Sequence, residues 1–190
     1  DIFSDDYLAK IDKIKLPNTK IKLLQKLLAK AINDIKKVNK IVGIDFSKRM
    51  QSIVEKYNER NENDVLRIEV LEDFTDEIID LYYALKKEKD SFKDLGIDFE
   101  EKAFYDILKA LAMKYDFSYP DDKLITLAQK VKTVVDDKAK YTDWSKRDDI
   151  KAELKVDLII LLAENDYPPI DRDEVYKEIF EQAENFKKFR

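Results

Sequence analysis

The stretch that decides the fold is TKIKLLQKLLAKAINDIKKVN, residues 19–39. Apolar residues recur in it every three or four positions, so that they share one side of a helix. Lysines recur on the opposite side. A stripe of this kind predicts an amphipathic helix with one buried face. The expected members of that face are Ile21, Leu24, Leu28, Ala31 and Ile35.

The same period continues along the chain on both sides of this stretch. Further helices are expected after Ser4, from about Ser47, over about 65–93, and after Asp98, Tyr119-Pro120, Asp143 and Tyr167-Pro168-Pro169. No segment shows the strict alternation of a strand, and no repeat of a helical solenoid is visible. We therefore expect an all-α protein: a single domain, residues 1–190, of about eight helices in a non-repeat bundle. The polar stretch 58–64 is a candidate subdivision.

Local signals predict where several helices begin and end. Gly43 is expected to end the helix of residues 19–39, and Gly96 to end the helix of 65–93. Asp98 with Glu101, and Asp171 with Glu174, have the spacing of capping boxes. Asp143 is expected to cap the helix that follows Trp144.

Composition excludes several kinds of chemistry. The 190 residues include no cysteine and no histidine. Disulfides, Cys or His metal sites, and Ser-His or Cys-His nucleophile pairs are therefore excluded. With only two isolated glycines there is no glycine-rich phosphate-binding loop, so we expect neither ATP hydrolysis nor a cofactor in this chain.

No apolar run approaches the roughly 20 residues that cross a bilayer. The longest, Leu158–Ala163, is expected to be a buried helix segment. We expect a cytoplasmic protein without membrane contact. The chain begins with Asp1 rather than methionine, so we also expect it to be a piece of a larger protein.

Two helices are expected to carry strongly charged faces. Lysines one turn apart in residues 19–39 are candidates for contacts with DNA phosphates; these are Lys22, Lys26, Lys30 and Lys37. Carboxylates in residues 65–93 are candidates for binding a basic partner; these are Glu69, Glu72, Asp73, Asp76 and Asp80. For each face the simpler alternative is a solvated surface, and the two faces could also pair with each other.

The single tryptophan, Trp144, precedes Arg147 by three residues. Tryptophan and arginine dominate the energetic centres of protein interfaces, which makes this pair a candidate partner site. The alternative is a local packing clamp, in which Arg147 stacks on the indole or meets a carboxylate.

Pro120-Asp121, followed by Glu153-Leu154-Lys155, matches the residue order of a nuclease metal site. In such sites the carboxylates bind Mg²⁺ and the lysine polarises water. That arrangement needs a β-hairpin, whereas helices are expected here. In a chain with 41 carboxylates we interpret the match as chance, and we expect no catalytic residue and no metal ligand.

Several short motifs in the second half resemble the C-terminal region of the restriction subunits of type I restriction-modification enzymes. They are Ala103-Phe104-Tyr105-Asp106, Leu124 with Leu127-Ala128, Asp143-Trp144-Ser145-Lys146-Arg147-Asp148, Tyr167-Pro168-Pro169 and Gln182-Ala183-Glu184-Asn185. Upstream, Phe46-Ser47 and Tyr57-Asn58 also fit the pattern. The family stretch before Tyr-Pro-Pro is often basic, whereas residues 158–166 here are apolar and acidic, which argues against DNA contact by that helix.

The resemblance implies a parent subunit with an endonuclease domain and two motor domains upstream, which uses ATP and Mg²⁺ to translocate and cut DNA. This chain is then expected to be a non-catalytic helical domain that docks the motor onto the methyltransferase (modification) and specificity subunits, and that meets DNA only through the parent complex. The alternative is an independent helical adaptor or scaffold protein. A helical metal-dependent nuclease is a third class.

Overall fold

The computed structural model describes residues 1–59, 68–141, 143–170 and 173–188; for 68–70 and 187–188 it describes the backbone alone. These residues form eight α-helices and no strand, which confirms the all-α class. The helices are α1 (Asp5–Asp12), α2 (Pro17–Val38), α3 (Lys40–Asn58), α4 (Ile68–Asp90), α5 (Phe99–Lys114), α6 (Asp121–Ala139), α7 (Asp148–Glu164) and α8 (Asp173–Lys188), with short 3₁₀ helices η1 (Ser91–Leu95) and η2 (Trp144–Lys146).

The chain divides into two compact units. Unit 1 comprises Asp1–Lys36 and Gly43–Asp90, and unit 2 comprises Lys37–Val42 and Ser91–Arg190. Of the candidate subdivision at 58–64, residues 58 and 59 belong to unit 1 and residues 60–64 lie outside the described residues. No helix in the described ranges combines the length and apolarity needed to cross a membrane.

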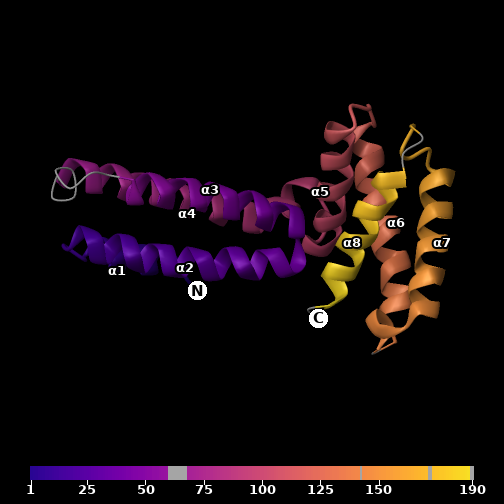
Figure 1. Cartoon of the computed structure of the whole chain (residues 1–190), viewed down its shortest axis with the longest axis horizontal. Helices are drawn as coiled ribbons and strands as arrows, with labels where there is room; N and C mark the ends of the chain where they lie inside the picture. The colour runs from indigo at the N-terminus through magenta and orange to yellow at the C-terminus, as the bar shows by residue number, and fades with distance from the viewer. Residues whose placement is uncertain (60–67, 142, 171–172, 189–190) are drawn as a thin grey trace. The chain divides into compact units, whose positions relative to one another are not determined.

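Unit 1 is an antiparallel arrangement of α1 to α4 (Figure 1). Near the end of α3, the Tyr57 hydroxyl donates a hydrogen bond to Asn18 at the start of α2. The Tyr57 ring also meets Phe74 of α4 edge-on, with ring centroids 5.1 Å apart. Near the end of α4, Lys86 lies 2.7 Å from Asp5 at the start of α1. Each helix therefore runs opposite to its neighbour, and the apolar faces turn inward.

The apolar stripe predicted for residues 19–39 faces the core of unit 1. In α2 the expected face is confirmed for Ile21, Leu24, Leu28 and Ala31, while Ile35 is half-buried. In α4 the buried side consists of Leu71, Phe74, Thr75, Ile78, Leu81, Tyr82 and Leu85. Burial of these stripes supplies the main driving force for packing helices with such exposed charged faces.

Gly43 does not end a helix, contrary to expectation. The helix expected from Ser47 begins at Lys40, so that Gly43 lies inside α3. A Cβ atom placed on Gly43 would lie 2.5 Å from the Cα atom of Lys36 in α2. The glycine is therefore required by the close approach of two helices, which a signal local in sequence does not reveal.

In unit 2, α6 and α8 pack on α5, and α7 packs on α6 (Figure 1). Phe104 of α5 meets Phe186 of α8 edge-on at 5.4 Å. The core is continuous through all four helices and η2; its fully buried members include Leu108, Leu127, Val131, Val135, Leu158, Leu162, Tyr167, Val175, Ile179 and Ala183. The Tyr167 hydroxyl donates to the backbone carbonyl of Leu108, and burial raises the pKa of that phenol.

Of the two predicted capping boxes, the one at Asp98 is confirmed. Ser4 accepts a hydrogen bond from the Tyr7 amide at the start of α1. Asp98 and Glu101 form the expected capping box of α5. Gly96, after η1, has a φ of 68°, a left-handed conformation that glycine adopts without strain.

The cap expected at Asp143 is wrong. The Asp143 side chain makes no capping hydrogen bond, because the separate turn η2 intervenes and α7 begins only after Arg147. For the second expected capping box, Asp171 lies outside the described residues.

Candidate functional site

One side of α4 is an acidic face, defined here by Glu72, Asp73, Asp76 and Asp80, all of which are exposed. Glu72, Asp76 and Asp80 stand one turn apart, where like charges repel. Within the described part of the chain, none of the four has an ion-pair partner, whereas Glu77 meets Lys56 at 3.5 Å. The side chain of Glu69 lies outside the described residues. The acidic face is therefore a surface that a basic partner would stabilise.

The lysine face of α2 is exposed as expected at Lys22, Lys26 and Lys30 in unit 1. Lys20, by contrast, is engaged by Asp12 at 3.0 Å. Lys37 is also exposed, but it belongs to unit 2. Three lysines at one-turn spacing remain available for phosphate contact in unit 1.

Trp144 lies in the core of unit 2 and is only 4% exposed. This burial agrees with the packing interpretation. Arg147 pairs with Asp149, with Nη2 and Oδ2 2.7 Å apart, and the guanidinium lies 5.8 Å from the centre of the Tyr141 ring. The hydrogen bond from Arg147 lowers the pKa of the Asp149 carboxyl. Of the two, Arg147 alone offers an exposed side chain to a partner.

The nuclease-like residues are held by separate partners. Asp121, the first residue of α6, accepts a hydrogen bond from the hydroxyl of Tyr105 in α5. Glu153 meets Lys138, near the end of α6, at 3.0 Å. The 17 residues from Asp121 to Lys138 span about 25 Å of helix, so that the two carboxylates cannot share one metal ion. In the described residues no group of three or more carboxylates is placed to hold a metal.

Segment Lys37–Val42 contains the end of α2 and the start of α3, and it is bound by two of the motifs that resemble the restriction-subunit family. Gln182 of α8 accepts a hydrogen bond from the Lys40 amide and donates one to the Val38 carbonyl, both at 3.2 Å. Asn39 donates to Asp106 of α5 at 2.7 Å. Gln182 and Asn39 are both buried. Residues of these motifs therefore supply hydrogen-bond partners to backbone groups where α2 ends and α3 begins.

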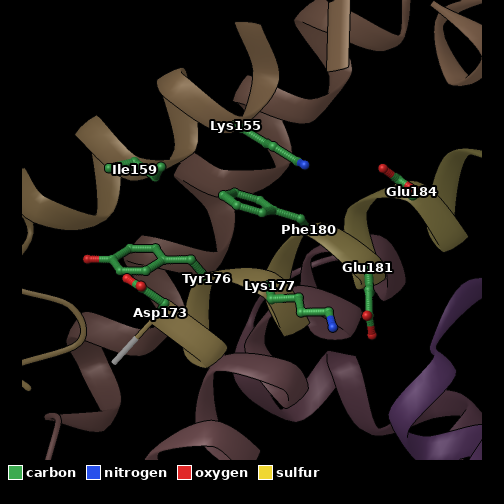
Figure 2. Close-up of a pocket in the computed structure, with 8 residues that line it drawn as sticks. All are labelled: Lys155, Ile159, Asp173, Tyr176, Lys177, Phe180, Glu181 and Glu184. Atoms are coloured by element: carbon green, nitrogen blue, oxygen red, sulfur yellow. The ribbon is translucent and has the colours of Figure 1, made fainter. Parts of the chain in front are cut away.

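A groove between α7 and α8 is a feature that the sequence analysis missed. It has a volume of about 420 Å³ and is lined by Lys155, Ile159, Asp173, Tyr176, Lys177, Phe180, Glu181 and Glu184. Figure 2 shows the Phe180 ring in the groove, pointing toward Lys155, whose ammonium lies 5.8 Å from the ring centre. The lining thus combines Ile159 and the rings of Tyr176 and Phe180 with five charged side chains.

The stretch Leu158–Ala163 is accordingly not buried throughout, contrary to expectation. Leu158 and Leu162 are fully buried, but Ile159 is 42% and Ile160 is 50% exposed. Consecutive residues of a helix point to all of its sides, so an unbroken apolar run places apolar side chains all around the helix. Only one side of α7 packs against other helices. The signal was present in the sequence, because Ile159 and Ile160 fall outside the stripe of Leu154, Leu158 and Leu161.

Comparisons with known proteins identify relatives along the whole chain. The family described as "Type I restriction enzyme HindI endonuclease subunit-like, C-terminal" matches residues 1–189. The putative type I restriction enzyme MjaIXP endonuclease subunit of Methanocaldococcus jannaschii is 28% identical, over 97% of this chain and 17% of its own length. The type I restriction enzyme HindI endonuclease subunit of Haemophilus influenzae is 23% identical, over 96% and 16%. No solved structure gives a significant match. The chain thus spans about one sixth of the length of these curated relatives.

Proposed function

Because this chain belongs to the family of C-terminal domains of HindI-like type I restriction endonuclease subunits, we propose that it is the domain that docks such a subunit onto its modification complex. The partners are the methyltransferase and specificity subunits, and the setting is the cytoplasm. The parent subunit cuts DNA and translocates it with ATP and Mg²⁺, through residues outside this chain. Family membership leaves no support for an adaptor outside DNA restriction.

The observation that carries the docking proposal is the acidic face of α4. Its four exposed carboxylates lie on the side of α4 opposite the buried residues, so they can be substituted without disturbing the packing of the core. Complementary charge raises the rate of encounter and fixes orientation, while buried contacts set the lifetime of a complex. A basic surface on the modification complex is the partner that fits this face.

The test is the binding of the chain to the purified methyltransferase–specificity complex at low and at physiological salt. Reversal of Glu72, Asp76 and Asp80 to lysine is expected to slow association about tenfold or more at low salt, and to weaken its salt dependence. The matched control reverses three exposed carboxylates of unit 2, Asp94, Asp137 and Asp143, and should leave association nearly unchanged.

A second variant separates docking from folding. Trp144→Ala removes a buried aromatic side chain, which costs about 3–5 kcal/mol, and should lower the melting temperature before it affects docking. The proposal would be contradicted if the chain bound bare duplex DNA tightly and did not bind the methyltransferase. That result would make the lysine face of Lys22, Lys26 and Lys30 the functional surface.

A further inference from the structure

Helix α7 is apolar on two sides, and the core of unit 2 covers only one of them. Leu154, Leu158 and Leu162 face the core, with exposures of 3% or less. On the outer side, Val156 is 54% exposed, beside Ile159 and Ile160. The apolar side of a helix in a globular protein normally packs against another element. The outer side of α7 is therefore an apolar surface that the rest of unit 2 leaves exposed.

The spacing of the outer side favours a helix as that partner. Ala152, Val156, Ile159 and Ala163 are all exposed and follow one another at intervals of four, three and four residues. This is the a and d spacing with which one helix packs lengthwise on another. The alanines at the two ends leave room for close approach of a second backbone.

The neighbouring groove extends this surface onto α8. Ile159 belongs to the outer side of α7 and also lines the groove, and Tyr176 and Phe180 continue the apolar lining one turn apart on α8 (Figure 2). A helix seated on α7 would place one row of apolar side chains on the outer side and a second row in the groove.

The charges around this surface favour a basic occupant. Among the residues that line the groove, Asp173, Glu181 and Glu184 outnumber Lys155 and Lys177. Glu181 and Glu184 lie 4.0 and 3.8 Å from Lys40 and Lys151, in long and partly exposed ion pairs that contribute little and that a closer cation can replace. A helix with lysine or arginine beside its apolar stripe would match these walls, whereas an acidic one would be repelled.

We propose that the outer side of α7, with the α7–α8 groove, binds a basic amphipathic helix of the modification complex. The proposal rests on the docking function proposed above and deepens it, because it supplies the apolar anchor that a charged face alone lacks. Apolar contacts at the centre of an interface govern the lifetime of a complex, and the acidic face of α4 governs its formation.

The test has a first arm that uses model peptides. A labelled helical peptide of about three heptads, with leucine at a and d and lysine at e and g, is titrated with the 190-residue chain by fluorescence anisotropy. Two further peptides replace lysine with glutamate or scramble the first sequence at equal charge. The basic amphipathic peptide is expected to bind about tenfold or more tightly than either. Equal binding of the scrambled peptide would overturn the proposal, because charge alone would then explain it.

Variants then locate the site. Val156→Glu and Ile160→Glu, each at an exposed position that folding tolerates, should each weaken the basic peptide about tenfold. The matched control is Met113→Glu, which changes a 77% exposed apolar residue on α5 of the same unit, and should leave affinity within about twofold. Circular dichroism melts confirm that each variant folds. Unchanged peptide binding by both α7 variants would overturn the proposal.

A second arm separates this proposal from the docking function and from self-association. If the chain binds the modification complex and the α7 variants dissociate from it no faster, the groove proposal fails and docking stands. If the chain does not bind the complex at all, docking fails, and with it the assignment of the occupant to that complex. If sedimentation shows a dimer of the chain that Val156→Glu abolishes, the occupant is a second copy and the proposal is wrong.

Discussion

At Gly43, packing against a neighbouring helix determines which residue fits, rather than the helix propensity of the residue itself. Glycine within a helix is normally destabilising, by about 0.5–1 kcal/mol relative to alanine. In α3, however, a Cβ atom at this position would meet the backbone of Lys36 at 2.5 Å. A helix backbone cannot yield as a flexible side chain does, so overpacking should dominate.

Gly43→Ala is therefore expected to lower the free energy of unfolding by about 1–3 kcal/mol. Urea unfolding followed by circular dichroism measures the change. Ser52→Ala, at an exposed position of the same helix, is the control and should change stability by no more than about 0.5 kcal/mol. A gain in stability from Gly43→Ala would show that helix propensity, not the close approach of α2, governs this position.

The connection between α2 and α3 illustrates what happens at the scale of an element. The sequence predicts both helices, but not that α3 starts at Lys40, almost directly after α2 ends at Val38. Two helix ends so close together leave backbone groups without helical partners. Gln182 of α8 supplies a donor and an acceptor to them, from a position more than 140 residues later in the chain.

Gln182→Met keeps the size of the side chain and removes both hydrogen bonds. Because Gln182 is 2% exposed, the Val38 carbonyl and the Lys40 amide would lose partners that water cannot readily replace, at a cost of about 1–3 kcal/mol for each buried group. Amide hydrogen exchange at Lys40 should speed up more than exchange in α6. Asn185→Ala is the control; its bond to the Lys37 carbonyl is long, at 3.5 Å, and exposed, so a smaller effect is expected. Equal effects of the two variants would contradict this account.

At the scale of the whole molecule, the arrangement of helices bears on chemistry. Asp121, at the start of α6, is held by Tyr105 of α5, and Glu153 of α7 is held by Lys138 near the other end of α6. We expect that the 190-residue chain neither cuts plasmid DNA with Mg²⁺ nor hydrolyses ATP, as gel electrophoresis and phosphate release would measure. Cleavage that disappears in Asp121→Ala or Glu153→Ala would show that the nuclease-like pattern had been dismissed wrongly.

The family motifs have a physical meaning that their order in the sequence does not show. Asp106, Tyr167 and Gln182 come from three separate motifs. All three make hydrogen bonds within unit 2: to Asn39, to the Leu108 carbonyl, and to the backbone of 38 and 40. These hydrogen bonds help to hold unit 2 together. Similarity of such residues therefore indicates a shared fold and does not by itself identify a binding surface.

The sequence alone determined the all-α class, the eight helices seen in the described residues, the buried stripe of α2 and the capping box at Asp98. These features depend on the 3.6-residue period and on hydrogen bonds between residues two to four apart, which are local in the chain. Tertiary structure decided the role of Gly43, the start of α3, the burial of Trp144, and the exposure of Val156, Ile159 and Ile160. Each of these features depends on which helix packs against the residue. A periodic pattern shows that one face of a helix is apolar, but it does not show whether another element covers that face.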